Sequence, residues 1–460
     1  MFIKKRFIYF LLWIITILIA IIFTFENPDK IQALKNKLKK DDNSIKTLDQ
    51  DSVIDTAYYS LNLKKIKTPV SSKYGGIEAI GEKIYYISGD SEFFQLQKKK
   101  NNQNKYDFIP LSLKKINNNK DKFLQKNASV LTEKYAQAYF GVKDILIEEF
   151  KSFENKVLLA SSLYYDVDKD CYNMSVYLSE IIDENILQIS DWKKIFSSNK
   201  CLSITLTKKP NFAAASAGGR IVKLDDENIL LSVGDFYADG VNGPMLSQNL
   251  NNDYGKIIKI NINNKKYEIF SYGHRNPQGL YIDKKKNIFS TEHGPRGGDE
   301  LNLVRKDNNY GWPYATFGTN YNSYNAYKDN QATSKNKSKR VWPIDKTNNT
   351  HNGFTKPIFS WGNTFGASNL IVYENEYFKK WNTNIIVSSL AAKQLTRFIY
   401  NYDNSSIHYL ENIPIGKRVR DIILLDNGSI ALLTDVTSSG ESTEDNHAEI
   451  IIINNSEKLK

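Results

Sequence analysis

Two short loops in residues 272–304 concentrate side chains that bind ligands or carry chemistry. The stretch reads YGHRNPQGLYIDKKKNIFSTEHGPRGGDELNLV, in a chain otherwise dominated by Lys, Asn and Ile. Its polar side chains are His274, Arg275, Asn276, Glu292, His293, Arg296, Asp299 and Glu300. Two ordinary polar loops on a β protein would be the simpler interpretation. We favour one functional site built from two neighbouring loop ends, because sites are built on loops that a rigid scaffold holds.

A repeated pattern of apolar runs must position these loops. Each unit pairs two β-branched or aromatic runs across turn residues such as DE, DK or DN, and helical periodicity is weak outside the N-terminus. The six units occupy 75–91, 153–182, 218–236, 278–294, 369–398 and 418–436. Six such units predict an all-β fold, a six-bladed β-propeller over residues 71–460.

The ends and the inserts of the propeller also have sequence signals. The late apolar run at 447–455 is expected to supply a strand that closes the ring with the N-terminal blade. The polar inserts 98–122 and 319–350 are expected to lie outside the blades. Residues 26–70 are polar with little periodicity and are interpreted as a stalk.

The propeller explains how distant residues can meet. Loops that follow equivalent strands share one face of the ring, and the segments before the hairpins, GHRNPQG and GKRVRD, reach the same face. The residues expected to converge there are Arg275, Asn276, Gly294, Pro295, Arg418 and Arg420. Three arginines beside an asparagine favour an anion with several carboxylates, since guanidinium binds carboxylate bidentately.

The N-terminus predicts a membrane anchor. A basic MFIKKR is followed by FIYFLLWIITILIAIIFTF, which has no charge and is nearly long enough to span a bilayer. No small-x-small cleavage site follows, although a cleaved signal peptide is the alternative. Residues 1–25 are therefore expected to form a single-pass helix in the inner (plasma) membrane, with the propeller in the periplasm.

Net charge does not identify a partner here. The chain of 460 residues has a formal net charge of +11, which can indicate nucleic-acid binding. The lysines are spread along the chain and no nucleic-acid motif accompanies them, so we expect no nucleic-acid partner.

Two cysteines, Cys171 and Cys201, are the minimum for one disulfide in an exported protein. Two unpaired thiols are an equal alternative. The stretch DVDKDC imitates a calcium loop but lacks the glycine and glutamate that such a loop needs.

Three motifs resemble the glucose/sorbosone dehydrogenase family. They are GHRNPQGL, then TEHGPRGGDELNLV with NYGWP, and KRVRDIILLDNGSIALLTD. Members of that family are soluble aldose dehydrogenases that carry pyrroloquinoline quinone (PQQ) and calcium on a six-bladed propeller. The resemblance covers roughly residues 70–455 and is strongest at 272–313 and 418–435.

The resemblance assigns roles to individual residues. It implies that Arg275 polarises the quinone carbonyl that receives hydride, with Asn276 beside it on the cofactor. Gly294 and Pro295 would offer backbone carbonyls to Ca²⁺, a hard cation that prefers oxygen ligands and acts as a Lewis acid. Arg418 and Arg420 would hold PQQ carboxylates. The simpler interpretation of each arginine is a surface ion pair.

Two departures from the family pattern affect the chemistry. The family's general base, a histidine, falls on Ser216, and Asp235 matches the acid that orients that histidine. Serine is no base at neutral pH, and general-base catalysis contributes about 10²–10⁴-fold. The family's cofactor lysine falls on Ala391. Lys393 lies two residues on, so in a strand it would face the same side and is our substitute cofactor-binding residue.

Two functions therefore remain open. One is a membrane-anchored PQQ- and Ca²⁺-dependent oxidoreductase that oxidises an aldose or related alcohol and passes electrons to an unknown membrane acceptor. Asp235, a water molecule or His351 would then act as the base. The other is an inactive propeller that binds a sugar, a polyol or a protein.

Overall fold

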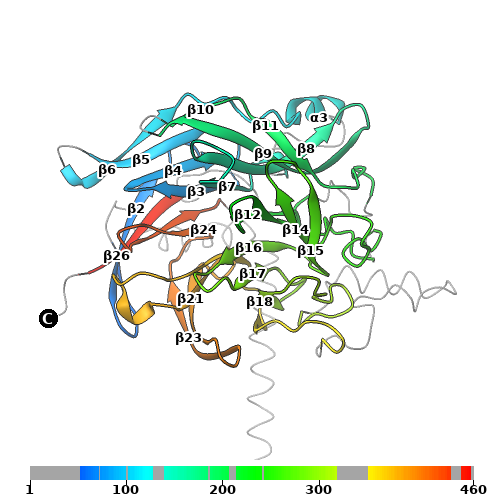
Figure 1. The fold of residues 1–460 in the computed structure, drawn as a ribbon. Helices are drawn as coiled ribbons and strands as arrows, with labels where there is room; N and C mark the ends of the chain where they lie inside the picture. The colour runs from blue at the N-terminus through cyan, green and yellow to red at the C-terminus, as the bar shows by residue number, and fades with distance from the viewer. Residues whose placement is uncertain are drawn as a thin grey trace, which may run out of the picture. The chain divides into compact units, whose positions relative to one another are not determined.

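Paired apolar runs fold into six antiparallel sheets that follow one another in chain order (Figure 1). The structure is a computed structural model. It describes residues 52–71, 73–99, 102–127, 139–184, 187–206, 214–240, 243–318, 351–436 and 447–456. All of these residues lie within one compact structural unit, Asp51–Lys460. The all-β prediction is confirmed.

The first three sheets contain the following strands, ordered from the inside of the ring outward. Blade 1 has β3 (Gly75–Ile80), β4 (Lys83–Ser88), β5 (Phe93–Lys99) and β6 (Asn102–Leu111). Blade 2 has β7 (Asp144–Glu148), β8 (Val157–Asp166), β9 (Cys171–Asp183) and β10 (Gln188–Ile189), with β11 (Lys193–Ser197) also paired to β9. Blade 3 has β12 (Gly218–Lys223), β13 (Asn228–Val233), β14 (Lys256–Asn261) and β15 (Tyr267–Tyr272). A short helix, α3 (Lys120–Lys126), precedes blade 2.

The second half of the ring has the same plan. Blade 4 has β16 (Pro277–Ile282), β17 (Ile288–Glu292), β18 (Asp299–Val304) and β19 (Phe359–Trp361). Blade 5 has β20 (Ala367–Val372), β21 (Ile385–Ser389), β22 (Gln394–Asn401) and β23 (Ser406–Pro414), with the 3-10 turn η2 (Lys379–Trp381) between its first two strands. Blade 6 has β24 (Val419–Leu424), β25 (Ile430–Thr434), β26 (Glu449–Asn455), β2 (Ser60–Lys67) and β1 (Ser52–Asp55).

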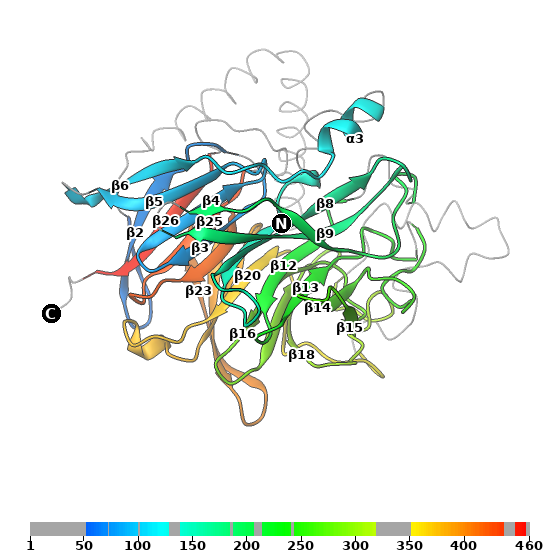
Figure 2. The same cartoon turned by 45° about the horizontal axis from the view of Figure 1, so that its top comes forward.

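The innermost strands close a ring. Each contacts the next in the order β3, β7, β12, β16, β20, β24, and β24 contacts β3 again. The chain ends close the last blade, because β26 pairs antiparallel with β2 from Leu61 to Lys67. In Figure 1 the red C-terminal strand accordingly lies beside the blue N-terminal one. Figure 2 views the same ring with its top turned forward. The predicted six-bladed propeller is confirmed, because six sheets surround one axis and their inner strands form a closed ring.

Four expectations about the blades need correction. The region 98–122 is not wholly outside the blades, because β5 and β6 run through its first half. The predicted stalk, 26–70, includes β1 and β2, which belong to blade 6. The unit predicted at 153–182 supplies the second and third strands of blade 2, and the short run β7 is the inner strand. The late run at 447–455 completes blade 6 with the N-terminal strands rather than the first blade.

The predicted anchor, residues 1–25, and the insert 319–350 lie outside the described residues. Within the ranges that the structure describes, no helix is both long enough and apolar enough to cross a bilayer.

A buried ion cluster links three inner strands at the axis. The Arg220 guanidinium on β12 donates to Asp144 on β7 at 2.5 Å and to Asp421 on β24 at 2.9 Å. All three side chains are buried. Burying an ion pair compensates its desolvation only when its hydrogen bonds are satisfied, and here one guanidinium ties three blades together.

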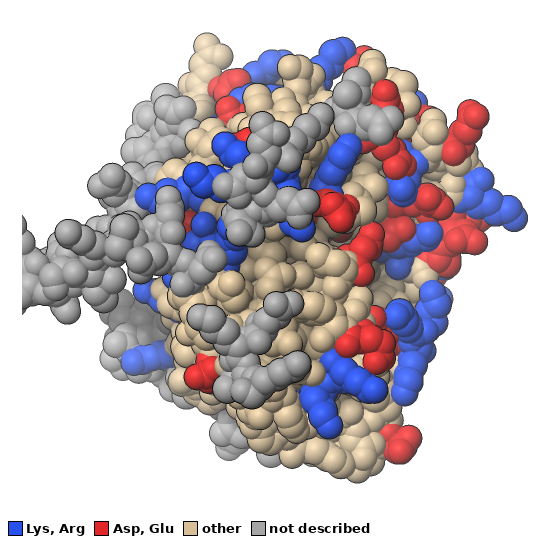
Figure 3. Space-filling model, turned by 90° about the vertical axis from the view of Figure 1, so that its left-hand side faces the viewer, with Lys and Arg blue, Asp and Glu red and all other residues tan. Residues whose placement is uncertain are grey.

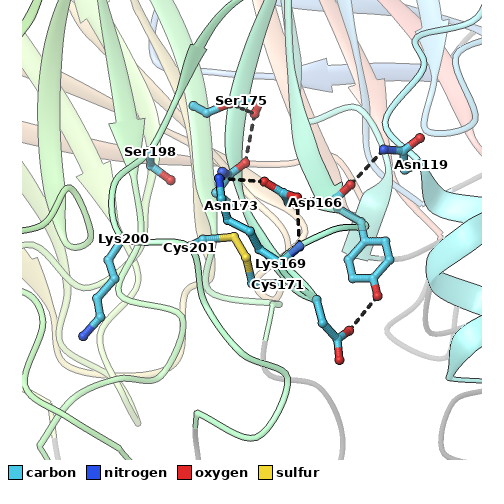
Figure 4. Close-up of a disulfide and its surroundings, with 12 residues drawn as sticks. Asn119, Asp166, Lys169, Cys171, Asn173, Ser175, Ser198, Lys200 and Cys201 are labelled. Carbon is cyan, nitrogen blue, oxygen red and sulfur yellow. Dashed lines mark hydrogen bonds and ion pairs between the residues drawn. A yellow bond between two sulfur atoms is a disulfide. The ribbon is translucent and has the colours of Figure 1, made fainter.

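The cysteines form a disulfide. Cys171, at the start of β9, is bonded to Cys201 with a Cα–Cα distance of 5.5 Å (Figure 4). The bond ties the β8–β9 turn to the segment that follows β11.

Charged side chains are interspersed on the face shown in Figure 3, where Lys and Arg lie among Asp and Glu. Exposed ion pairs among the described residues include Lys99 with Asp107 at 2.7 Å and Lys126 with Asp170 at 3.0 Å. Such exposed pairs contribute little to stability.

Candidate functional site

The starts of the inner strands surround one cavity of about 260 Å³ at the axis. Its lining includes Arg275, Asn276, Gly294, Pro295, Arg418 and Arg420, so the structure brings together six of the nine site residues proposed from the sequence. The lining also contains Lys73, Tyr74, Tyr237, Gln278, His293 and Asp299. Residues more than 100 positions apart therefore meet because equivalent ends of the inner strands share one face.

A recurring irregularity positions these side chains. The pairing between the first two strands shifts register near the start of the inner strand in blades 3, 4, 5 and 6. The shift lies at Pro277–Gly279 just after Asn276, and at Val419–Asp421 around Arg420. A β-bulge bends the strand and re-aims a side chain, which explains how arginines at these points turn into the axis.

Arg275 is held on several sides. Its backbone N–H donates to Glu292 Oε2 at 2.9 Å. Its Nη1 donates to the carbonyls of His293 and Gly294 at 3.1 and 2.9 Å. The guanidinium carbon lies 5.7 Å from the Tyr237 ring centroid and 5.3 Å from that of Trp312. These contacts fix a cation in the cavity wall.

Asn276 joins neighbouring blades. Its Oδ1 accepts hydrogen bonds from the Gly218 backbone at 3.1 Å and from Gln278 Nε2 at 2.9 Å. Gln278 Oε1 in turn accepts from Arg420 Nη1 at 2.9 Å. The amides therefore connect Asn276 to Arg420 across the cavity floor.

The two arginines of blade 6 differ in their partners. Arg420 is paired with Asp435 through both Nε and Nη2. Arg418 Nη1 donates to the Leu390 carbonyl at 3.3 Å, and its buried Nε has no hydrogen-bond partner. A buried donor without an acceptor is unfavourable, so the site is suited to an anionic oxygen at this point.

Positive charge exceeds negative charge in this cavity. The cationic side chains of the lining are Lys73, Arg275, Arg418 and Arg420. Two carboxylates oppose them. Asp435 is bound to Arg420, and Asp299 accepts hydrogen bonds from the backbone of Gly294 and Ala367. A planar ligand with several carboxylates would balance this excess of positive charge. PQQ is such a ligand.

Of the three residues proposed to be catalytic, Arg275 lines the cavity, whereas Ser216 and Asp235 do not. Ser216 is buried and its Oγ is 3.5 Å from the Arg275 carbonyl, which also accepts from the Asp235 N–H at 2.7 Å. Ser216 and Asp235 therefore converge on one carbonyl. Asp235 Oδ2 accepts from the Trp312 indole at 2.7 Å and Oδ1 from the Tyr237 amide at 2.9 Å. Burial raises the pKa of Asp235 to about 6, although Arg275 lowers it.

The calcium assignment fits the chain only in part. Gly294 and Pro295 line the cavity, and carbonyl oxygens are donors that Ca²⁺ accepts. The Gly294 carbonyl, however, already accepts from Arg275. In the ranges that are described, no group of three His, Cys, Asp or Glu residues is arranged to hold a metal. Gly294 and Pro295 would supply two carbonyl oxygens, and the cofactor and water would supply other ligands.

Two residues proposed from the sequence lie elsewhere. Lys393 is exposed and does not line the cavity. It sits at φ 56° in the turn after β21, so the two-residue period of a strand does not apply, whereas Ala391 does line the cavity. His351 is 1% exposed, stacks on Phe317 at 4.7 Å and lies 3.4 Å from Glu300 Oε1. It is not part of the lining, which removes it as a base in this geometry.

Lys73, Trp312 and Asp435 were missed by sequence reasoning. The signal for Lys73 was available, because SKYGG precedes the inner strand of blade 1 as GHRN precedes that of blade 4. Trp312 lies in the quoted NYGWP motif, but nothing in the motif shows that its indole reaches Asp235.

Comparison with known proteins agrees with this geometry. The family model described as Glucose / Sorbosone dehydrogenase matches residues 115–443. The chain belongs to the glucose/sorbosone dehydrogenase family. It is 28% identical over 275 residues to the aldose sugar dehydrogenase YliI of Escherichia coli, which covers 56% of this chain and 65% of that protein. The chain spans about three fifths of the length of the curated relatives it matches.

Solved structures share the fold. The soluble aldose sugar dehydrogenase of E. coli in its apo form superposes with a TM-score of 0.63 at 20% identity, covering 86% of this chain and 100% of that one. A PQQ-bound aldose sugar dehydrogenase from Streptomyces coelicolor superposes with a TM-score of 0.55 at 16% identity, covering 88% of this chain and 98% of that one.

Proposed function

We propose that this protein is a PQQ- and Ca²⁺-dependent dehydrogenase that oxidises an aldose or a related alcohol. The observation that carries the proposal is the axial cavity, whose lining holds four cationic side chains and one carboxylate, and in which Arg418 Nε lacks a partner. A tricarboxylate quinone would satisfy both features. Family membership and the names of the relatives support the same chemistry.

The residues of the chain would divide the work as follows. Arg418 and Arg420 would bind carboxylates of PQQ, since charge-assisted guanidinium contacts are strong and directional. Asn276 and Gln278 would orient its edge. Arg275, fixed between Tyr237 and Trp312, would stabilise negative charge that develops on a reacting oxygen. PQQ would supply the two-electron acceptor. Ca²⁺ at Gly294 and Pro295 would act as a Lewis acid, and Arg275 would then have to share or release the Gly294 carbonyl.

Proton abstraction is the step for which this chain is poorly equipped. Ser216 occupies the place of the family's histidine, and Asp235 is engaged by Trp312 and Tyr237. This observation favours the second candidate function, a propeller that binds a sugar, polyol or protein without turnover. An active enzyme would need a water molecule or Asp235 as the base.

The location is also part of the proposal. Residues 1–25 would anchor the chain in the inner membrane, with the propeller in the periplasm and electrons passing to a membrane acceptor. The Cys171–Cys201 disulfide supports export, because disulfides persist in oxidising compartments. Protease protection in spheroplasts, in which the propeller should be cleaved from outside, tests the topology.

One reconstitution experiment separates the two functions. The full-length protein in detergent is titrated with PQQ in the presence and absence of Ca²⁺, followed by absorbance, and then assayed for dye reduction with several aldoses. PQQ binding with sugar-dependent dye reduction supports the dehydrogenase. PQQ binding without turnover would mean that proton abstraction fails because the base is missing. No PQQ binding supports the binding propeller.

A further inference from the structure

A second layer of positive charge lies beside the cavity, around Tyr74. The Tyr74 ring lines the cavity and is buried. The Lys143 ammonium lies 3.3 Å from its ring centroid, and the Lys73 ammonium lies 5.6 Å from it. The Arg420 guanidinium is 5.0 Å from the same centroid. Three cations therefore surround one aromatic side chain.

The two lysines sit in surroundings that disfavour their charge. Burial lowers the pKa of Lys143 well below its usual value, and Arg420 and Lys73 lower it further. Burial also lowers the pKa of Lys73, while Asp435 raises it. Asp435, the acid that faces both, is already bound by Arg420 through two nitrogens. An additional anion at this point would therefore stabilise both ammonium groups.

A glycine at the start of β12 leaves space for the Lys143 side chain. Gly219 has a φ of 112°, and a Cβ there would lie 2.4 Å from Lys143 Cβ. The close approach of this strand start holds the Lys143 stem in place, so its ammonium is directed under Tyr74 rather than into solvent.

Lys73, Tyr74 and Arg420 line the same cavity as Ala391, whereas Lys143 lies outside its lining. The resemblance places the family's cofactor lysine at Ala391, and Lys393 is too exposed and wrongly placed to replace it. Blade 5 therefore lacks a lysine at this cavity, whereas Lys73 precedes the inner strand of blade 1 and Lys143 precedes that of blade 2.

We propose that Lys73, supported by Lys143 beneath Tyr74, forms a cationic subsite that binds one carboxylate of the cofactor in place of the lysine missing at Ala391. The inference rests on the proposed function. Lys73 lines the cavity and contacts the ligand, whereas Lys143 is a positioning residue that acts through Tyr74 and through its charge. Because a bound carboxylate favours protonated lysines, binding takes up protons and weakens as the pH rises.

Binding rather than turnover tests the subsite. The full-length protein and its variants are titrated with PQQ at fixed Ca²⁺, followed by absorbance. Lys73→Gln is expected to bind PQQ about tenfold more weakly or worse, the scale of one charge-assisted contact. Lys265→Gln, which changes an exposed lysine in the β14–β15 turn, is the matched control and should bind as the parent does.

Two further measurements distinguish a subsite from a general loss of charge. Ala391→Lys in the Lys73→Gln background should recover at least part of the affinity, because position 391 faces the same cavity. The affinity of the parent should fall as the pH is raised toward 10.5, the ordinary pKa of a lysine, and this fall should be smaller in Lys143→Gln. Lys143 is buried, so thermal melts must first show that its variant is folded; the partly exposed Lys73 carries the test if it is not.

The outcomes separate this inference from the proposed function. If the parent binds PQQ and Lys73→Gln binds equally well, the subsite is wrong and the proposed function stands. If the parent and every variant fail to bind PQQ, the proposed function is wrong and the subsite falls with it.

Discussion

The Trp312 indole donates a 2.7 Å hydrogen bond to Asp235 Oδ2, in the place where the family resemblance implies a histidine partner. The Tyr237 amide occupies the other carboxylate oxygen at 2.9 Å. Asp235 is thus fully engaged although Ser216 offers it no imidazole. The same tryptophan also flanks Arg275, so one side chain joins the buried acid to the cationic wall of the cavity.

Removing that indole donor should destabilise the fold. In Trp312→Phe the buried Asp235 carboxylate loses a hydrogen-bond donor, and the pKa of Asp235 should rise above its present value of about 6 because the hydrogen bond lowers it. We expect a loss of about 1–3 kcal/mol in the free energy of unfolding, measured by urea titration. Trp192→Phe, which removes an exposed indole contact to the Lys114 carbonyl, is the control and should lose much less. Equal losses would show that the Asp235 contact has no special weight.

Glu78 should make stability depend on pH. It faces Asp144 and Asp421 at the axis, and burial raises its pKa to about 8. The folded state then binds more protons than the unfolded state between about pH 4.5 and about pH 8, so stability falls as the pH rises through this window. Glu78→Gln should abolish part of this fall and be more stable than the parent at about pH 9, by on the order of 1 kcal/mol. Melting temperatures across the pH range measure it, with the exposed Glu82→Gln as the control. If the melting temperatures of the parent and of Glu78→Gln changed with pH in parallel, Glu78 would not be the source of the pH dependence.

The disulfide should stabilise the outer part of blade 2. Cys171 and Cys201 are 30 positions apart, and a bond that closes such a loop typically stabilises a protein by about 2–4 kcal/mol. Cys171→Ser with Cys201→Ser should therefore lower the free energy of unfolding by about that amount in urea titrations. Reductant should destabilise the parent to a similar degree and leave the double variant unchanged. A parent that is insensitive to reductant would mean that the bond contributes little.

The inner hairpins were predictable from the sequence because their apolar runs and turn residues are local signals. The strands missed were those whose burial depends on the ring. β6 and the end of β5 lie on the outside of blade 1, so they carry lysines and asparagines and resemble a loop in composition. β2 also carries lysines, although Leu61 and Leu63 are buried in the core, and its pairing with β26 and β1 depends on contacts far along the chain or in the assembled blade.

The candidate site was predictable where motif and topology agreed, and not where contact geometry decides. Arg275 and Arg420 come together because equivalent strand starts share a face. Lys393 was misplaced because its backbone is in a turn, at φ 56°, where alternation no longer holds. Lys143 could not have been chosen from sequence, since its role depends on the ring of Tyr74, which belongs to the neighbouring blade.

The absent base gives the sharpest test of the chemistry. Ser216 Oγ and the Asp235 N–H both face the Arg275 carbonyl, so an imidazole at position 216 would start from a point adjacent to Asp235 and Arg275. We expect Ser216→His, loaded with PQQ and Ca²⁺, to oxidise aldoses at least about tenfold faster than the parent, the cautious end of general-base contributions. Dye reduction measures the rate, and a PQQ titration of both proteins confirms that they are equally loaded. Ser216→Asn, which adds similar bulk without a base at neutral pH, is the control and should not gain activity. A parent rate that already equals that of Ser216→His would mean that another group accepts the proton, and Asp235→Asn would then be the variant that abolishes it.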